Sequence, residues 1–386
     1  MGIIRKCPAA APKSGRAPVT AASHILIKTA GGMGVQSDVR FLWGGYDEGR
    51  YCGYAQDWYT LDSRVVLLKG GAGTGKSTLM KRVRERWLRQ GRETVSFYCS
   101  ADPSSLDAVC TADRRLCIMD ATAPHAREAR FPAAVERLAD LGSCLDGVKL
   151  REQLPRLTEL TARQQDRRLR AGQYLRAAAV LARQEVQDPE NRPSESALLR
   201  CAGRLARQAF GGERGEGGDR RAYLSGITPD GGVVFYDTLT ALCPQVYVLE
   251  DDPGPAARLL ALLQHKAALA GVPTITCPCA LRPDCIEHLL MPSVGAAFTT
   301  SDRFHEVDFP VYRHLSMLRC RERPLSAQER HRRELGRRTQ QELLAEATEL
   351  LAGAREDHRR EEEIYQAAMD WEQAACLTEQ VAAWLT

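Results

Sequence analysis

The sequence feature that most restricts how this chain can fold is a glycine-rich run, Gly70–Ser77, which fits the pattern G-x-x-x-x-G-K-[ST]. The apolar segment Arg64–Lys69 before it is long enough for a buried strand, and Thr78–Leu88 after it carries apolar residues at helical spacing. A loop of this kind between a strand and a helix directs backbone amides and the helix N-terminus toward an anion. The run therefore predicts an α/β unit with a site for a nucleotide polyphosphate.

Each position of this loop has an expected role at such a site. Lys76 should reach the β- and γ-phosphates, Ser77 should ligate Mg²⁺, and Thr78 is placed to help bind the α-phosphate. The remaining nucleotide-binding positions supply backbone amides and conformational freedom: Gly70, Gly71, Ala72, Gly73, Thr74 and Gly75. The sequence shows no Asn-Lys-x-Asp signature for guanine, so ATP is the expected nucleotide.

A carboxylate at the end of a hydrophobic strand is expected to complete the Mg²⁺ site, and Asp120 ends such a segment. The next residue is Ala121, so the Asp-Glu pair of many motor-type ATPases is absent and a catalytic base must come from elsewhere. Asp102 and His125, which follow predicted strands, could each orient a water molecule or an acceptor hydroxyl. Each could equally be a loop residue that makes local hydrogen bonds.

The second half of the chain contains a weak repeat of the first. Arg64–Val83 aligns with Gln245–Gln264, and collinear identities continue downstream. These identities pair Cys99 with Cys279, Pro103 with Pro283, and His125 with His305. We interpret the repeat as an internal duplication. The fold class that it predicts is α/β, with tandem P-loop NTPase-like domains that are each a parallel sheet flanked by helices.

The repeated loop lacks the residues that bind phosphate. The replacements are Gly75 by Ala256, Lys76 by Ala257, Ser77 by Arg258, and Asp120 by Thr300. Glu250, Asp251 and Asp252 put carboxylates where a polyphosphate would lie, and two prolines remove amide donors. The second half is therefore expected to be a degenerate copy that binds no nucleotide.

Several motifs together resemble an uncharacterised bacterial family of tandem P-loop ATPases, whose members are sometimes labelled nucleotide-kinase-like. The segments that carry the resemblance are Lys69–Met80, Cys99–Asp102, Ser105–Asp107, Asp120–His125 and Tyr365–Trp371. The resemblance implies two P-loop halves that alternate with helical segments, and it implies no particular substrate. Both halves can carry a P-loop in that family, so the degenerate second loop departs from its pattern.

Helical periodicity and turn-rich breaks divide the chain into five parts. These are a flexible N-terminal tail (1–38), a P-loop NTPase domain (39–149), a helical arm and linker (150–218), a degenerate P-loop-like domain (219–325) and a C-terminal helical arm (326–386). The charge runs of the arms are expected to be solvated helix faces. The alternative interpretation is an interaction surface for an unknown protein partner or an anion.

Composition limits the partners and the location. No apolar run approaches the ~20 residues that a membrane-spanning helix needs. The net charge of +4 does not indicate nucleic-acid binding. Thirteen cysteines without a secretion signal predict free thiols and a cytoplasmic protein. The cluster Cys277, Cys279, Cys285 and His288 matches no standard zinc spacing and is expected to be buried near a strand end.

These observations predict an ATP-binding P-loop NTPase that hydrolyses ATP with Mg²⁺ at the N-terminal site and has a non-binding second half. One alternative is a kinase for a small, nucleotide-like acceptor, in which arginines such as Arg127 and Arg130 form a lid. Another is a nucleotide-gated binding module without significant turnover. Arg258 and Arg303 are candidates for a cation that the second half presents to the γ-phosphate.

Overall fold

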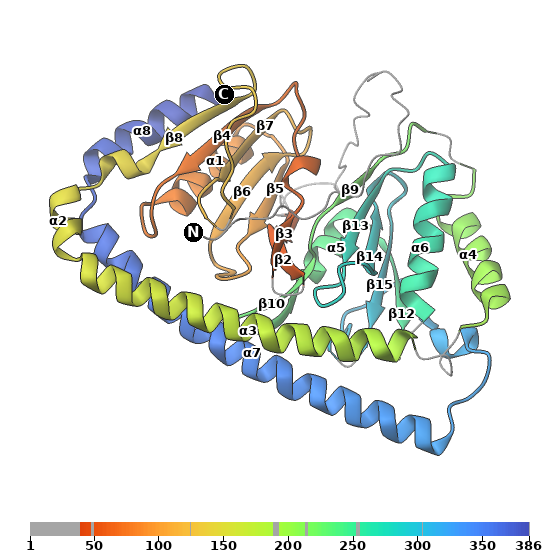
Figure 1. Ribbon diagram of the computed structural model, residues 1–386. Helices are drawn as coiled ribbons and strands as arrows, with labels where there is room; N and C mark the ends of the chain where they lie inside the picture. Colours follow the sequence, from red (N-terminus) through yellow and green to blue (C-terminus); the bar gives the residue numbers. More distant parts are fainter. Residues whose placement is uncertain are drawn as a thin grey trace.

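The computed structural model describes residues 39–47, 50–123, 125–187, 193–212, 215–251, 255–302 and 304–385. Within these ranges the chain is α/β, with two six-stranded sheets flanked by helices (Figure 1). The predicted N-terminal tail, residues 1–38, lies outside the described residues, as do Asp252 and Arg303.

The first sheet is mixed rather than parallel. Its strands, in spatial order, are β1 (Val39–Leu42), β5 (Thr94–Tyr98), β6 (Leu106–Thr111), β7 (Leu116–Asp120), β4 (Arg64–Lys69) and β8 (Glu136–Asp140). Strand β4 runs parallel to its neighbours β7 and β8, whereas β6 runs antiparallel to both β5 and β7. The prediction of a parallel sheet is therefore wrong at β6.

Short connections force β6 into the antiparallel direction. Residues 99–105 join β5 to β6, and residues 112–115 join β6 to β7. A parallel connection needs a dozen or more residues, so neither segment can provide a crossover. No strand is predicted at β6 from the sequence, because every residue of it is buried and it lacks the alternation of a half-exposed strand.

The second sheet has the same strand order and directions as the first. Its strands, in the matching order, are β9 (Asp219–Arg221), β13 (Thr274–Pro278), β14 (Ile286–Met291), β15 (Ala296–Ser301), β12 (Gln245–Glu250) and β16 (Arg313–Ser316). It is likewise mixed, because β14 is antiparallel to both neighbours. Corresponding register pairs are Phe97–Ala108 with Cys277–His288, and Leu68–Asp120 with Leu249–Thr300. This agreement supports the alignment of the two halves.

Alternation along the strands directs apolar side chains into separate cores. Val65 and Leu67 of β4 join a core between the two sheets, which also contains Val246 and Val248 of β12. Val66 points to the opposite face of the first sheet, toward its helices. The two sheets therefore share one core between them and each have a second core on the outer face.

Each outer face is covered by two helices. One of the two follows, in the sequence, the last strand of the other sheet. α1 (Lys76–Arg89) and α8 (Trp371–Trp384) contribute to the core of the first sheet, and α6 (Pro255–Leu269) and α4 (Glu195–Phe210) to that of the second. Because α4 follows the first sheet and α8 follows the second, the two halves exchange helices (Figure 1).

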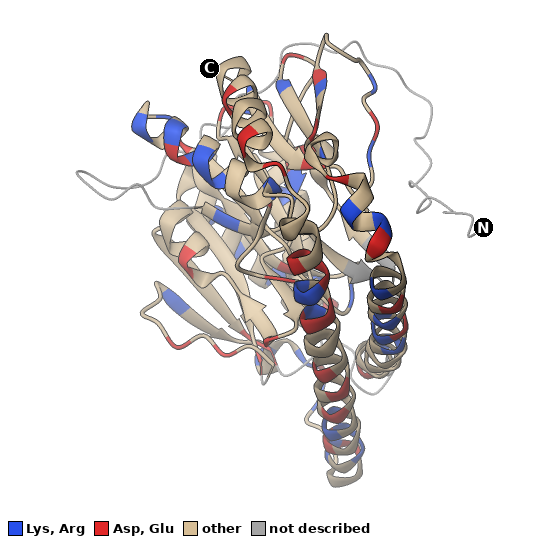
Figure 2. Ribbon diagram, turned by 90° about the vertical axis from the view of Figure 1, so that its left-hand side faces the viewer, with Lys and Arg blue, Asp and Glu red and all other residues tan. Residues whose placement is uncertain are grey.

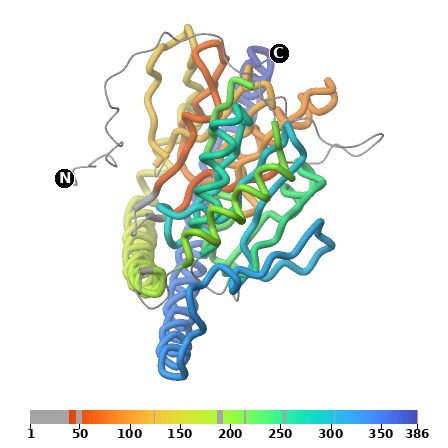
Figure 3. Tube along the Cα trace, turned by 90° about the vertical axis from the view of Figure 1, so that its right-hand side faces the viewer, coloured from red at the N-terminus to blue at the C-terminus, as the bar shows by residue number. Residues whose placement is uncertain are grey.

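The exchange is made by two long helices that lie side by side. α3 (Leu154–Gln187) and α7 (Ala327–Ala367) run antiparallel along one side of both sheets (Figures 1 and 3). Their small apolar contact is formed by Ala171, Leu175, Ala347 and Leu351. Acidic and basic residues are interspersed along both helices (Figure 2).

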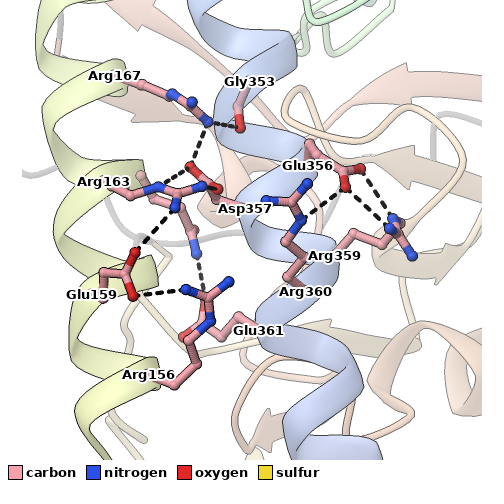
Figure 4. A network of polar contacts seen from close by, with 11 residues as sticks. Arg156, Glu159, Arg163, Arg167, Gly353, Glu356, Asp357, Arg359, Arg360 and Glu361 are labelled. Carbon is pink, nitrogen blue, oxygen red and sulfur yellow. Dashed lines mark hydrogen bonds and ion pairs between the residues drawn. The ribbon is translucent and has the colours of Figure 1, made fainter.

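Charged side chains bind α3 to α7. The carboxylate of Asp357 on α7 is fully buried and accepts hydrogen bonds from Arg163 and Arg167 on α3 (Figure 4). Gln164 Nε2 donates to Glu361 Oε2 at 2.7 Å. A buried carboxylate needs such partners, because an unpaired buried charge costs several kcal/mol, on the order of 3–5. Polar contacts therefore join the two helical arms. Only some of their charged side chains lie on a solvated face, although the sequence predicts this for all of them.

Short elements complete the chain. They are β2 (Gly44–Asp47), β3 (Arg50–Gly53), η1 (Ala55–Asp57), η2 (Leu141–Cys144), α2 (Gly147–Glu152), β10 (Ser225–Thr228), β11 (Gly231–Val234), α5 (Tyr236–Leu242), η4 (Pro292–Val294) and η5 (Met317–Cys320). Direct hydrogen bonds also join the halves, for example from Leu42 N to Tyr223 O at 2.8 Å.

Two sequence expectations concern cysteines and membranes. Cys110 and Cys117 lie opposite each other in β6 and β7 and form a disulfide, so the expectation of free thiols is wrong for this pair. The sequence separation gave no sign of it, because the pairing of adjacent strands brings the two residues together.

In the described ranges, no helix is long and apolar enough to cross a membrane.

Candidate functional site

The loop Gly70–Ser77 lies between β4 and α1, as the sequence predicts. Gly70, Gly73 and Gly75 have φ angles of 148°, 66° and 88°, which residues with a side chain rarely adopt. Gly75 is also the N-cap of α1, so the unpaired amides of the first helical turn face the loop. An anion placed there would meet both these amides and the positive end of the helix dipole.

Lys76 and Asp120 converge beside this loop. The Lys76 ammonium lies 3.6 Å from Asp120 Oδ2 and donates to the carbonyls of Gly70 and Gly71 at 3.1 and 2.7 Å. Both side chains are mostly buried, at 12% and 15% exposed. They meet because β4 and β7 are parallel neighbours, so their C-terminal ends share one edge of the sheet.

The residues expected to hold Mg²⁺ lie at the same edge. Ser77 Oγ accepts a hydrogen bond from the amide of Leu106 at 3.0 Å, and Asp120 Oδ1 accepts one from the amide of Thr122 at 2.7 Å. Ser77 and Asp120 both line the adjoining cavity. A hydroxyl and a carboxylate are oxygen ligands of the kind that Mg²⁺ prefers, so this donor set fits the ion.

The cavity has a volume of about 760 Å³ and is bounded by both halves of the chain. One wall is the loop with α1, and further walls come from α3, α7, α8 and the turn between β10 and β11. Leu169, Leu351 and Ala354 supply an apolar section, while Arg168, Arg355 and His358 supply polar groups. All the loop positions expected to bind nucleotide from Gly71 to Thr78 line it.

The C-terminal arm touches the loop directly, which the sequence did not reveal. A Cβ atom on Gly73 would lie 2.7 Å from the carbonyl oxygen of Glu362, and one on Gly71 would lie 3.0 Å from the Tyr365 ring. Trp371, the first residue of α8, lies over Gly75. Tyr365–Trp371 is one of the segments that carry the resemblance to the tandem P-loop family, and this could have marked it as functional. The sequence does not indicate, however, that the segment contacts the loop.

Asp102 and His125, the two candidates for proton transfer, both line the cavity. Asp102 Oδ1 accepts hydrogen bonds from the amide and hydroxyl of Ser104, a local loop arrangement. His125 Nε2 lies 3.1 Å from Asp107 Oδ2, and both side chains are less than a tenth exposed. Asp107 belongs to the Ser105–Asp107 motif, but the sequence does not indicate its pairing with His125, because it does not predict β6.

Cys99 is the third member of the His125–Asp107 group, and one ligand atom from each of the three residues lies within 4.8 Å of the others. Burial, together with the neighbouring Asp107 carboxylate, holds the pKa of the Cys99 thiol well above its ordinary value. The thiol is therefore protonated at neutral pH and is a poor nucleophile.

The arginines around the cavity differ from those the sequence favoured. Arg127 donates to Tyr59 Oη at 3.0 Å. Arg258 on α6 forms an ion pair of 2.7 Å with Glu195 on α4, and both helices cover the second sheet. Neither they nor Arg130 belong to the described residues that line the cavity. The lining arginines are Arg82, Arg168 and Arg355. Arg355 also forms two hydrogen bonds of 2.7 Å to Asp230, in the turn between β10 and β11.

In the second unit, a carboxylate of the chain itself occupies the end of the corresponding helix. Asp251 Oδ2 accepts a hydrogen bond at 3.2 Å from the amide of Ala256 in the first turn of α6. Thr300 lies opposite Leu249, in the register position that Asp120 has in the first sheet. The adjoining cavity is small, about 100 Å³.

A buried ion pair occupies the position that corresponds to Asp107 and His125. Glu287 Oε1 lies 3.2 Å from His305 Nε2, and Glu287 Oε2 lies 3.2 Å from His288 Nε2. Burial by itself would lower the pKa of His305, but the Glu287 carboxylate raises it to about 9. Burial would raise the pKa of Glu287, but the two histidines hold it well below its ordinary value.

The comparisons with known proteins give one family. Residues 53–167 match the model of the family described as nephrocystin 3, N-terminal. The matched stretch contains the Gly70–Ser77 loop, Asp120 and the start of α3, and it is less than a third of the chain. No curated protein and no solved structure matches the chain significantly. Over this stretch, the chain is therefore similar to the nephrocystin 3 N-terminal family.

Proposed function

We propose that this chain is an ATP-binding P-loop NTPase that hydrolyses ATP with Mg²⁺ at the Gly70–Ser77 site. The observation that carries the proposal is the convergence of Lys76 and Asp120 on this loop, at one end of a cavity of about 760 Å³. That volume is in the range, roughly 300–1,000 Å³, of pockets that enclose small-molecule ligands.

The residues of the site have distinct proposed roles. The loop amides and the α1 N-terminus bind the phosphates, and Lys76 leaves the Gly70 and Gly71 carbonyls to reach the β- and γ-phosphates. Ser77 and Asp120 hold Mg²⁺, which neutralises phosphate charge when it is bound. Asp102 and His125 remain the candidates that orient a water molecule, and their place in the cavity wall supports this role.

The second unit is proposed to be a degenerate duplicate without a nucleotide. Its sheet repeats the strand order and register of the first, and Asp251 already supplies an anion to the N-terminus of α6. A polyphosphate such as ATP would be repelled there, because the Asp251 carboxylate already carries negative charge. The same topology supports the proposal of tandem P-loop-like units of common origin.

The contact of α7 and α8 with the loop supports a conformational use of ATP. Glu362 and Tyr365 lie against Gly73 and Gly71, and Trp371 lies over Gly75. A change in the phosphates would therefore act directly on α7. Helix α7 also packs against α3 and contacts Asp230 of the second half. A movement at the loop would therefore move α7 and α3 together.

A small-molecule kinase is the alternative with a specific supporting observation. Arg168 and Arg355 line the cavity, and cations near a transferring phosphoryl group suit either hydrolysis or transfer to an acceptor. Incubation of the purified protein with ATP, Mg²⁺ and a metabolite extract distinguishes the two. Inorganic phosphate as the sole phosphate product supports hydrolysis, and a phosphorylated metabolite found by mass spectrometry supports the kinase.

The nucleotide site itself is tested by calorimetric titration of the full chain with ATP and Mg²⁺. We expect about one nucleotide per chain. Lys76→Ala should lose charge-assisted hydrogen bonds of about 1.5–3 kcal/mol each and weaken binding more than about tenfold. Lys81→Ala is the matched control, because Lys81 lies on the same helix and bonds to Ser104. Two nucleotides per chain, or equal losses in both variants, would overturn the proposal.

A further inference from the structure

Three metal-ligating side chains from separate segments converge on one wall of the large cavity. Cys99 follows β5, Asp107 lies in β6, and His125 lies beyond the end of β7. Their sulfur, carboxylate oxygen and imidazole nitrogen atoms lie within 4.8 Å of one another. We propose that these three residues bind one divalent transition-metal ion of the zinc class, at a site separate from Ser77 and Asp120.

The spacing of the ligand atoms is close to that of a tetrahedral site. His125 Nε2 and Asp107 Oδ2 are 3.1 Å apart. Metal–ligand bonds of about 2.0–2.3 Å place the ligand atoms of a tetrahedral zinc ion roughly 3.3–3.8 Å from one another. Small side-chain rotations would therefore close the shell around an ion, without a change of the strands.

The chemistry of the three ligands selects the kind of metal. Mg²⁺ and Ca²⁺ take oxygen ligands, whereas a thiolate and an imidazole favour Zn²⁺ and its neighbours in the first transition row. Binding of such an ion would displace the thiol proton, and the Cys99 thiolate and the Asp107 carboxylate would then share one cation. The group is consequently better matched to zinc than to the ion that accompanies ATP.

The position of the group gives the ion access and an open coordination position. All three residues line the cavity; Cys99 is partly accessible, and the side chains of Asp107 and His125 are each less than a tenth exposed. Three protein ligands are the usual number in zinc sites that keep one position for water or substrate. The three residues and the loop positions Gly71–Ser77 line the same cavity, so the open position would adjoin the space beside the loop.

The second unit indicates that this group does not depend on phosphate binding. Cys279, Glu287 and His305 occupy the aligned positions, although the second unit lacks the lysine and aspartate of the loop site. There, both oxygens of Glu287 are engaged, one by His305 and the other by His288 and Ser225. That carboxylate is saturated by protein groups, so we assign the metal to the first unit.

The inference stands independently of the proposed ATPase activity. Ligation through Nε2 would occupy the nitrogen that His125 needs for proton transfer. It would leave Asp102 as the candidate that orients water. The metal can be detected without nucleotide, so its absence and an absence of ATP binding are separate results.

Cobalt is the probe, because Co²⁺ substitutes for zinc and a thiolate ligand gives it a near-ultraviolet charge-transfer band. The full chain is reduced, freed of metal with a chelator and titrated with Co²⁺ in the absence of nucleotide. We expect one equivalent to bind with tetrahedral visible bands and the thiolate band. One equivalent of Zn²⁺ should then bleach both.

Variants assign the ligands. Cys99→Ser should remove the charge-transfer band, and His125→Ala should weaken Co²⁺ binding by at least about 100-fold, since even second-shell changes cost 10–100-fold. Cys279→Ser is the matched control and should keep one equivalent with an unchanged spectrum. Asp107→Asn, which preserves side-chain volume, covers the case in which His125→Ala fails to fold.

Three results would overturn the proposal. The first is wild-type protein that binds no Co²⁺ or Zn²⁺ at micromolar concentration. The second is a thiolate band that survives Cys99→Ser. The third is a spectrum that depends on Cys279. Metal analysis of the purified wild-type protein gives the same decision without any variant, because it should contain close to one zinc per chain.

Discussion

The pairing of β4 with β7 determines the surroundings of the Asp120 side chain. Its position at the end of β7, opposite Leu68, places one oxygen 3.6 Å from the Lys76 ammonium and leaves the carboxylate in the cavity wall. The sequence identified this residue from a hydrophobic segment that ends in aspartate. Its distance from Lys76 follows from the parallel pairing of two strands, which is a tertiary property.

If Asp120 acts through Mg²⁺, Asp120→Asn should lower ATP turnover by orders of magnitude, because the neutral amide is a poor ligand for the ion. Affinity for ATP without Mg²⁺ should change little. Both quantities are measured by phosphate release and by titration with and without Mg²⁺. An equal loss under the two conditions would mean that the aspartate supports the fold rather than the metal.

The pair Glu287–His305 predicts a pH dependence of stability. The pKa of His305 is raised to about 9, so its contribution is complete below the unfolded pKa near 6.5 and is lost as the pH rises through 9. The difference in unfolding free energy between wild type and His305→Ala should thus be about 3 kcal/mol near pH 6 and shrink toward pH 10.

Denaturant unfolding at several pH values measures this difference. His314→Ala is the control, since His314 pairs with Glu250 at the surface with both side chains about half exposed. A difference for His305→Ala that is constant from pH 6 to 10 would contradict the pairing. The alignment of the two halves identifies His305 as the counterpart of His125. It does not identify Glu287 as the partner of His305.

At the scale of elements, the long helix α7 connects the two units at the cavity. It carries Arg355, which contacts Asp230 of the second unit and also lines the cavity beside the loop. It also carries Asp357, which holds α3. The periodicity of the sequence predicts α7 as a helix, and its N-terminus is fixed by a capping box between Ser326 and Glu329.

Arg355 is the arginine that we expect to assist phosphoryl transfer. Arg355→Ala should slow ATP hydrolysis by about 10³ or more with little change in ATP affinity, as loss of an arginine finger does. Arg258→Ala is the matched control and should hydrolyse ATP at the wild-type rate, because Arg258 pairs with Glu195 outside the cavity lining. A normal rate in Arg355→Ala would exclude this role.

On the scale of the whole molecule, the exchange of α4 and α8 makes the two units depend on each other. The first sheet needs α8, because the buried residues Val381 and Ala382 of this helix, and Leu385 directly after it, complete the core that contains α1. The fragment 39–218 contains the first sheet but not α8, and its α4 has lost the sheet that covers its apolar face. Division at the sequence boundaries therefore does not yield an independent domain.

We expect fragment 39–218 alone to aggregate or unfold, because apolar surface on β4, α1 and α4 is uncovered. Coexpression with the rest of the chain, 219–386, should restore a soluble complex. In that second piece, Val381→Asp should prevent copurification, whereas Glu379→Ala at an exposed position of α8 should not. Affinity purification and melting curves provide the measurements, and a monomeric, cooperatively melting fragment 39–218 would refute the mutual dependence.

The sequence alone determined the features that arise from neighbouring residues. Glycines with positive φ, an apolar strand and an amphipathic helix specify the Gly70–Ser77 loop locally, and the repeat carries the same unit to the second half. Only the tertiary structure decided the place of β6 between β5 and β7, the exchange of α4 and α8, and the meeting of Cys99, Asp107 and His125. The physical reason is that an apolar or polar pattern shows which face of an element will be covered, but the covering partner depends on how distant elements pack.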